Sequence, residues 1–101
     1  MINVLASIKV KTGSKSEFIK IFKANVPSVI KEKGCIEYFP TIDFDTKLSA
    51  QNLDADVVTI IEKWESIEAL KNHLNATHMA TYREKVKDMV ESVSLKVLQE
   101  A

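Results

Sequence analysis

Most of the side chains that could take part in chemistry lie in one stretch, residues 61–79. Glu62 and Trp64 are two positions apart, so in a strand they point to the same face. That face also carries Val58 and Ile60, and a carboxylate among apolar side chains must be hydrogen-bonded, paired or protonated. Glu62 is therefore either a structural anchor or a tuned acid or base. Trp64, the only tryptophan, is either a core residue or a wall on which a flat aromatic ligand stacks.

The two histidines follow in the same stretch. His73 borders an apolar stripe, where it either satisfies a neighbouring carbonyl or carboxylate, or serves a substrate oxygen as proton acceptor or hydrogen-bond donor. His78 falls in the first turn of a predicted helix, where the free N–H groups disfavour a charged imidazole, so it is either neutral or simply exposed. The two rings are five positions apart across a helix break, with no zinc spacing and no carboxylate cluster. We predict no metal site.

Three further polar side chains are candidates for contacts. Tyr38 and Tyr82 are expected to be packing residues whose hydroxyls reach a polar partner. Asn3 lies on a strand face with Leu5 and contacts either a ligand or a second copy of the chain. Cys35 stands alone, without a motif, and is expected to be a small core residue.

The composition excludes several classes of protein. The chain has 101 residues, enough for one domain over residues 1–101, and its 14 basic residues balance 14 acidic ones, so nucleic-acid binding is not expected. Its two glycines exclude a glycine-rich phosphate loop. No apolar run approaches the ~20 residues that span a bilayer, and no signal peptide is evident at the start. We expect a soluble, cytoplasmic protein without a cofactor. If it is an enzyme, the substrate itself would have to supply the reactive electrons that a cofactor otherwise provides.

The candidate residues are positioned by alternating strands and helices. Period-two patterns predict strands at 2–10, 35–44, 57–64 and 93–97, with a protruding polar loop at 45–55. Helical spacing predicts a helix from a Ser14/Glu17 capping box to a stop at Gly34, kinked or restarted at Pro27, and two short helices capped by Ser66 and Thr77. The order β-α-β-β-α-β is that of a ferredoxin-like α+β fold, with the helices on one face of a four-stranded antiparallel sheet.

The opposite face of that sheet also carries large apolar side chains. Leu5, Phe39, Val57 and Ile61 should project there, away from the helices. Because a large exposed apolar patch on a small protein marks an interface, we predict a homodimer in which two sheets pack face to face.

The chain resembles the antibiotic-biosynthesis monooxygenase (ABM) domain family over essentially its whole length. The matching stretches are Val26–Cys35 with Tyr38, Ile61–Ile67 with its Glu-x-Trp element, His73-Leu74, Thr77-His78-Met79 with Tyr82, and Val97-Leu98-Gln99. The resemblance implies a dimeric α+β barrel and a cavity between sheet and helices. It also implies cofactor-independent use of O₂ on quinols or polycyclic phenols, started by a pocket base.

Matched position by position, the resemblance assigns roles to the candidates. His73 would be the base or hydrogen-bond partner, Trp64 the stacking wall, and Glu62 the residue that orients His73 or a pocket water. The second-rank lining candidates are Tyr38, His78, Met79 and Tyr82. The tryptophan and histidine that haem-degrading members use are absent, since those positions fall at His73 and near Arg83, so haem degradation is not expected.

Two alternatives stay open beside a quinol monooxygenase. One is a non-catalytic dimeric module on the same fold that binds an aromatic metabolite in a stress response. The other is a different small-molecule enzyme on this scaffold, such as an isomerase of a signalling compound. The same scaffold hosts several activities, so the fold alone does not decide between them.

Overall fold

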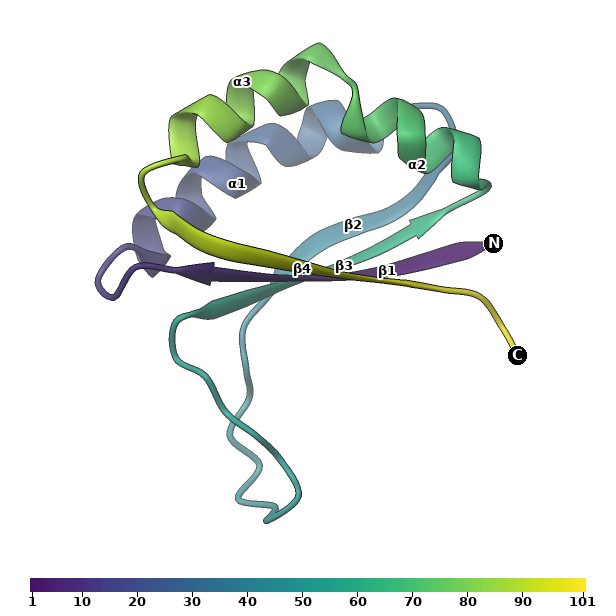
Figure 1. The fold of residues 1–101 in the computed structure, drawn as a ribbon. Coiled ribbons are helices and arrows are strands. Elements are labelled where there is room, and N and C mark those ends of the chain that lie inside the picture. The colour runs from purple at the N-terminus through teal and green to yellow at the C-terminus, as the bar shows by residue number, and fades with distance from the viewer.

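The computed structural model describes residues 1–101 and confirms the ferredoxin-like α+β fold (Figure 1). The elements run in the order β1 (Ile2–Val10), α1 (Lys15–Ile30), β2 (Cys35–Thr41), β3 (Val57–Trp64), α2 (Ile67–Leu74), α3 (Thr77–Val86) and β4 (Val90–Leu98). The strands form one antiparallel sheet in the order β2-β3-β1-β4. All three helices cover the same face of this sheet.

The two central strands carry the candidate residues into the core. In β1 every second residue from Val4 to Val10 is buried, as the alternation predicts. Val4 pairs with Glu62, and Ile2 pairs with Trp64 on β3. Glu62 and Trp64 therefore enter the space between sheet and helices. Pro40 lies in β2, an edge strand, as its missing N–H requires.

The ends of several elements differ from the sequence predictions. Ser14 precedes α1, but its backbone is in the helical region rather than extended, and its side chain makes no capping hydrogen bond, so the predicted capping box is wrong. Pro27 lies within α1 and does not divide it. The helix ends at Ile30, and Gly34 falls later, in the turn before β2, with φ of +87°. Ser66 does cap α2, because its Oγ accepts a hydrogen bond from Ala69 N at 3.2 Å.

Three other boundaries also shift. Thr77 is the first residue of α3, and its cap position is Ala76. β2 ends at Thr41 instead of residue 44, and β4 begins at Val90, three residues before the predicted start.

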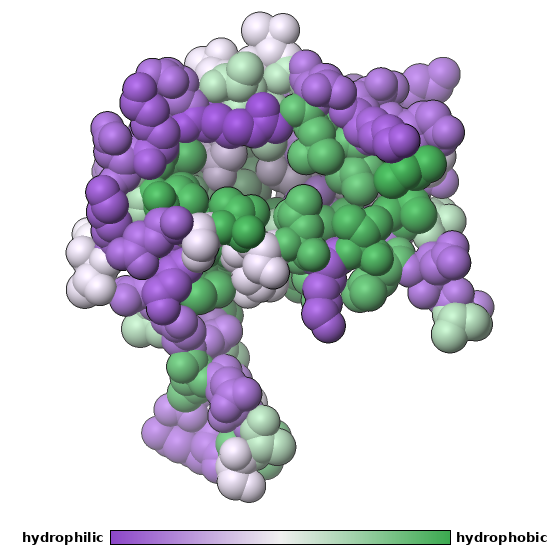
Figure 2. All heavy atoms as spheres, viewed as in Figure 1, coloured by the Kyte–Doolittle hydropathy of each residue, from purple (hydrophilic) through white to green (hydrophobic).

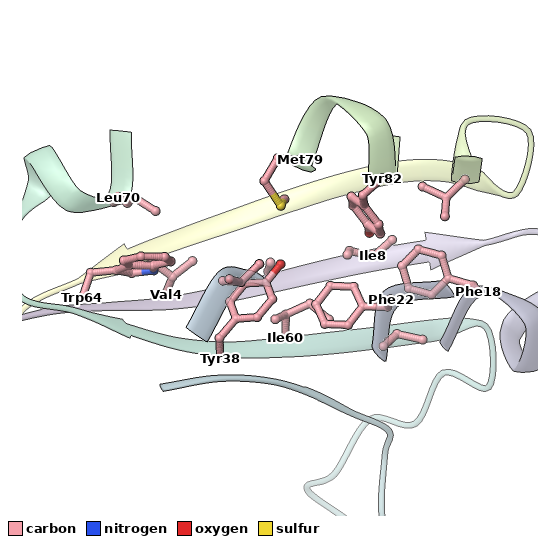
Figure 3. Packing of buried hydrophobic residues seen from close by; sticks show 14 of the residues in the cluster. Val4, Ile8, Phe18, Phe22, Tyr38, Ile60, Trp64, Leu70, Met79 and Tyr82 are labelled. Carbon is pink, nitrogen blue, oxygen red and sulfur yellow. The ribbon is translucent and has the colours of Figure 1, made fainter. Parts of the chain in front are cut away.

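An aromatic cluster fills the core beneath α1 and α3 (Figure 3). Phe22 stacks on Tyr38 with ring centroids 5.3 Å apart and meets Tyr82 edge-on at 5.6 Å. Phe18 contacts both Phe22 and Tyr82. These rings link α1 and α3 to the edge strand β2, and they form one end of the space in which the candidate residues lie.

Apolar side chains remain uncovered on both faces of the sheet. Val93, Leu95 and Val97 of β4 lie opposite Ile8, Ala6 and Val4 and so face the helices, yet they are about half exposed because no helix covers β4. Figure 2 shows this band of hydrophobic atoms along β4. On the other face, Leu5 is 37% exposed and Phe39 42% exposed.

The β2–β3 connection extends away from the sheet on the side opposite the helices (Figure 1). It spans residues 42–56, which confirms the predicted protruding loop. Gln51 orders its tip by bonding the Phe44 carbonyl at 2.7 Å and the Thr46 amide at 3.1 Å. No helix of the fold is both long and apolar enough to cross a lipid bilayer.

Candidate functional site

A cavity of about 380 Å³ lies between the sheet and the helices. This volume falls in the range typical of small-molecule sites. Most of its lining residues are hydrophobic. Five of the predicted site residues line it: Tyr38, Glu62, His73, Met79 and Tyr82. Three do not: Trp64, His78 and Asn3.

Trp64 does not have the predicted role of a stacking wall for a ligand. Its side chain is completely buried and lines no part of the cavity. The indole Nε1 donates a hydrogen bond to Glu62 Oε1 at 3.0 Å. The indole ring packs against the His73 ring, with centroids 4.7 Å apart and planes tilted by 36°. Trp64 is therefore a platform that holds two cavity residues in place.

Glu62 is a buried carboxyl group in the wall of the cavity, only 6% exposed. Burial raises its pKa from 4.5 to about 7, the hydrogen bond from Trp64 opposes this shift, and the charge of Glu32 adds to it. Its hydrogen bond goes to Trp64 and not to His73, so it can influence His73 only through the indole, and the alternative role of orienting a pocket water stays a prediction. Glu62 thus changes its protonation state near neutral pH inside an apolar cavity.

The residue that contacts His73 is Glu32, which was not among the predicted site residues. Glu32 Oε2 lies 2.8 Å from His73 Nδ1 and 2.9 Å from His78 Nε2. The three groups come from the turn after α1, the end of α2 and the start of α3. Of the two interpretations of His73, the one in which the ring meets a neighbouring carboxylate is therefore confirmed, and that carboxylate is Glu32. Their ligand atoms lie within 4.8 Å of one another, close enough for a metal ion, although hydrogen bonds to one carboxylate oxygen already account for the arrangement.

His73 is held as a rigid neutral ring. It is 2% exposed, and burial lowers its pKa from 6.5 more than Glu32 raises it. Tyr38 meets the ring edge-on at a centroid distance of 5.2 Å, while Trp64 lies against it. Because Nδ1 is occupied by Glu32, Nε2 is the nitrogen available to a ligand in the cavity.

Tyr38 and Tyr82 place two phenol groups in the cavity wall. Burial is the main cause that raises the pKa of each, so both stay protonated. The prediction that their hydroxyls reach polar partners is wrong, because neither oxygen makes a hydrogen bond within the chain, and neither is fully buried. Figure 3 shows the Tyr38 oxygen pointing into the space between sheet and helices. Both hydroxyls are free to contact a ligand.

The remaining candidates lie elsewhere. His78 lines a second hollow, between α1 and α3, together with Asn25. Asn3 lines a hollow near both chain ends with Lys63, on the sheet face away from the helices. Cys35 is half-buried and packs against the core cluster instead of lying within it, and burial raises the pKa of its thiol to about 11.

Known proteins resemble this chain over its whole length. The family model for "Antibiotic biosynthesis monooxygenase" matches residues 1–85. "Probable quinol monooxygenase YgiN" of Escherichia coli (strain K12) is 37% identical over 101 residues, covering 98% of this chain and 97% of the relative.

Solved structures share the fold. PA3566 from Pseudomonas aeruginosa superposes with a TM-score of 0.82 at 21% identity, over 99% of this chain and 93% of that one. A conserved protein from Methanosarcina mazei Go1 gives a TM-score of 0.84 at 20% identity, over 99% and 92%. At these identities the two structures establish the fold alone. The family match and the E. coli relative show more: this chain belongs to the antibiotic biosynthesis monooxygenase family.

Proposed function

We propose that the protein is a monooxygenase of quinols or related polycyclic phenols, bound in the cavity between sheet and helices. Membership of the family supports a monooxygenase-type function, and the name of the E. coli relative suggests a quinol as substrate. The observation that carries the proposal is a buried neutral histidine, His73, in the wall of an apolar cavity that also holds two free phenol hydroxyls. A flat ring with hydroxyl groups matches such a lining.

The proposed reaction begins with removal of a proton. His73 Nε2 accepts the proton of a quinol hydroxyl, and the resulting anion gives electrons to O₂ more readily than the neutral quinol does. The quinol supplies four electrons in all. One oxygen atom of O₂ forms a bond to a ring carbon whose hydrogen is lost, the ring leaves as a hydroxyquinone, and the second oxygen atom leaves as water.

The chain's own residues bind and orient the substrate and keep water out of the cavity. The Tyr38 and Tyr82 hydroxyls donate hydrogen bonds to substrate oxygens, and Met79 packs against the ring. The apolar lining keeps water away from the anion, which strengthens its electrostatic contacts. Trp64 contributes indirectly, because it packs against the His73 ring and holds the Glu62 carboxyl group by a hydrogen bond.

Aerobic turnover of menadiol by the purified protein tests this function. With isotopically heavy O₂, we expect a hydroxylated product that carries one heavy oxygen atom. Product without heavy oxygen, formed together with hydrogen peroxide, would mean simple oxidation and would contradict the monooxygenase step.

The base is tested by His73→Ala and His73→Gln beside Asn72→Ala, which changes an exposed neighbour on α2. Loss of a general base should lower kcat by about 100-fold or more. The Asn72→Ala protein should keep the wild-type rate. Equal rates for all three variants would remove His73 from the mechanism.

The active form in this proposal is a homodimer. Leu5 and Phe39 are partly exposed on the sheet face away from the helices, next to the half-buried Ile61. The 42–56 loop extends from the same side, where it could reach along a second copy that packs on this face (Figure 1). Packing this face against the same face of a second copy would remove the Leu5 and Phe39 side chains of both copies from water.

A further inference from the structure

Glu32, His73 and His78 form a continuous hydrogen-bonded path from the cavity to the surface. The exposed fraction of the side chain rises along it, from 2% at His73 to 14% at Glu32 and 30% at His78. Both histidine nitrogens meet the same oxygen, Glu32 Oε2, at 2.8 and 2.9 Å. A carboxylate oxygen only accepts, so each of the two imidazoles must donate an N–H to it.

The turn that presents Glu32 is fixed against α2. Gly34, with φ of +87°, lies so close to α2 that a Cβ atom there would be 2.6 Å from Ala69 Cβ. The Gly34 carbonyl also accepts a hydrogen bond from Glu65 N at 2.8 Å. A residue larger than glycine would push the turn away from α2. The close approach therefore delivers the Glu32 carboxylate to His73.

The contact with Glu32 determines where the proton of the His73 ring lies. A neutral imidazole carries one proton, and donation to Glu32 places it on Nδ1, so Nε2 keeps its lone pair. Tyr38 and Trp64 pack on the ring and prevent it from turning over. His78 donates to Glu32 from the solvent side and so holds the carboxylate in line with His73.

We propose that Glu32 is a positioning residue for the reaction, which keeps His73 Nε2 free to accept the substrate proton and stabilises the imidazolium that results, and that His78 anchors Glu32. This inference rests on the proposed function. In the balanced step, the O–H bond of the quinol breaks and an N–H bond forms at Nε2. The Nδ1–H bond to Glu32 persists throughout, and the positive ring then lies 2.8 Å from a negative oxygen.

The kinetic test compares Glu32→Gln with Glu68→Gln, which removes the same charge from an exposed site on α2. We expect Glu32→Gln to lower kcat by about 100-fold, with a small change in KM, because the lost interaction belongs to the transition state. Glu68→Gln should behave as wild type. His78→Gln should lower kcat by a smaller factor, since Glu32 keeps its charge. An unchanged kcat in Glu32→Gln would overturn the proposal.

A second readout does not depend on turnover. Nitrogen NMR of labelled imidazole should show His73 with its proton on Nδ1 in the wild type and a shift toward Nε2 in Glu32→Ala. If wild type turns over no quinol, the proposed function fails, while this spectrum still tests the positioning role. His73 with its proton on Nε2 in the wild type would overturn the proposal. So would activity that is lost with EDTA and restored by a divalent metal, because the three groups would then hold an ion.

Discussion

The buried carboxyl of Glu62 makes the stability of the fold depend on pH in a defined direction. Its pKa is 4.5 in an ordinary environment and about 7 in the folded protein, mainly because burial disfavours the charged form. Below pH 4.5 both states of the protein carry the proton. Between the two pKa values the unfolded chain has lost it and the folded chain keeps it, so the free energy of unfolding falls as pH rises. Above the folded pKa the full cost of the buried charge remains.

The size of this effect follows from the gap between the two pKa values. At about 1.4 kcal/mol for each pKa unit, the gap corresponds to about 3 kcal/mol of stability lost between roughly pH 4 and pH 8. Glu62→Gln removes the titrating group but keeps an oxygen that can accept the Trp64 indole N–H. The variant should therefore lack this loss. Its free energy of unfolding, minus that of wild type, should be about 3 kcal/mol larger at pH 8 than at pH 4.

The measurement is urea unfolding of both proteins at several pH values and one protein concentration. The difference between the two proteins at each pH isolates Glu62, because the shift at His73, which acts in the opposite direction, is common to both. A difference that stays constant from acid to alkaline pH would refute the reasoning, because Glu62 would then titrate alike in the folded and unfolded chains.

Two further predictions concern the turn at Gly34 and the back of the sheet. Gly34→Ala should lower the free energy of unfolding by roughly 2–4 kcal/mol, because alanine is strained at positive φ and its Cβ would overlap Ala69. Gly13→Ala is the control: φ is also positive there, but nothing lies within 4 Å, so the loss should be only about 1 kcal/mol. Similar losses at both glycines would show that contact with α2 does not matter. Leu5→Glu should convert the proposed dimer to a monomer in light scattering coupled to size-exclusion chromatography, because it places two charges at an apolar interface. Lys31→Glu, at an exposed position just after α1, should not. A wild-type protein that is already monomeric would contradict the dimer.

The sequence predicted the fold well because its strands alternate cleanly. The burial of Val4 and Ala6, the exposure of Leu5 and the edge position of Pro40 all follow from period-two patterns and the geometry of proline. The ends of α1 were harder. A serine followed by a glutamate has the pattern of a capping box, but the backbone angles at Ser14 prevent the bond, and no sequence pattern encodes those angles.

The candidate site could be predicted only in part, because its central contact is distant in sequence. Glu32 lies 41 positions from His73 and sits between two lysines, a setting typical of a solvated surface turn. The signal that could have identified it is Gly34: a glycine two residues later is typical of a turn with positive φ or a close approach, and the structure shows both at this position. The burial of Trp64 was one of two interpretations that the pattern allowed, and only the tertiary packing distinguishes them.

The two titratable groups in the cavity are joined through Trp64 and are not independent. The indole donates to Glu62 and lies against His73, so any change that frees the indole also loosens the ring that would accept the substrate proton. Removing the Glu62 carboxyl by substitution with alanine would therefore alter His73 as well, and its effect could not be assigned to the lost acid. Glutamine at this position keeps the acceptor for the indole. The Glu-x-Trp element thus acts as a support that fixes His73 from the sheet side, while Glu32 fixes it from the helix side.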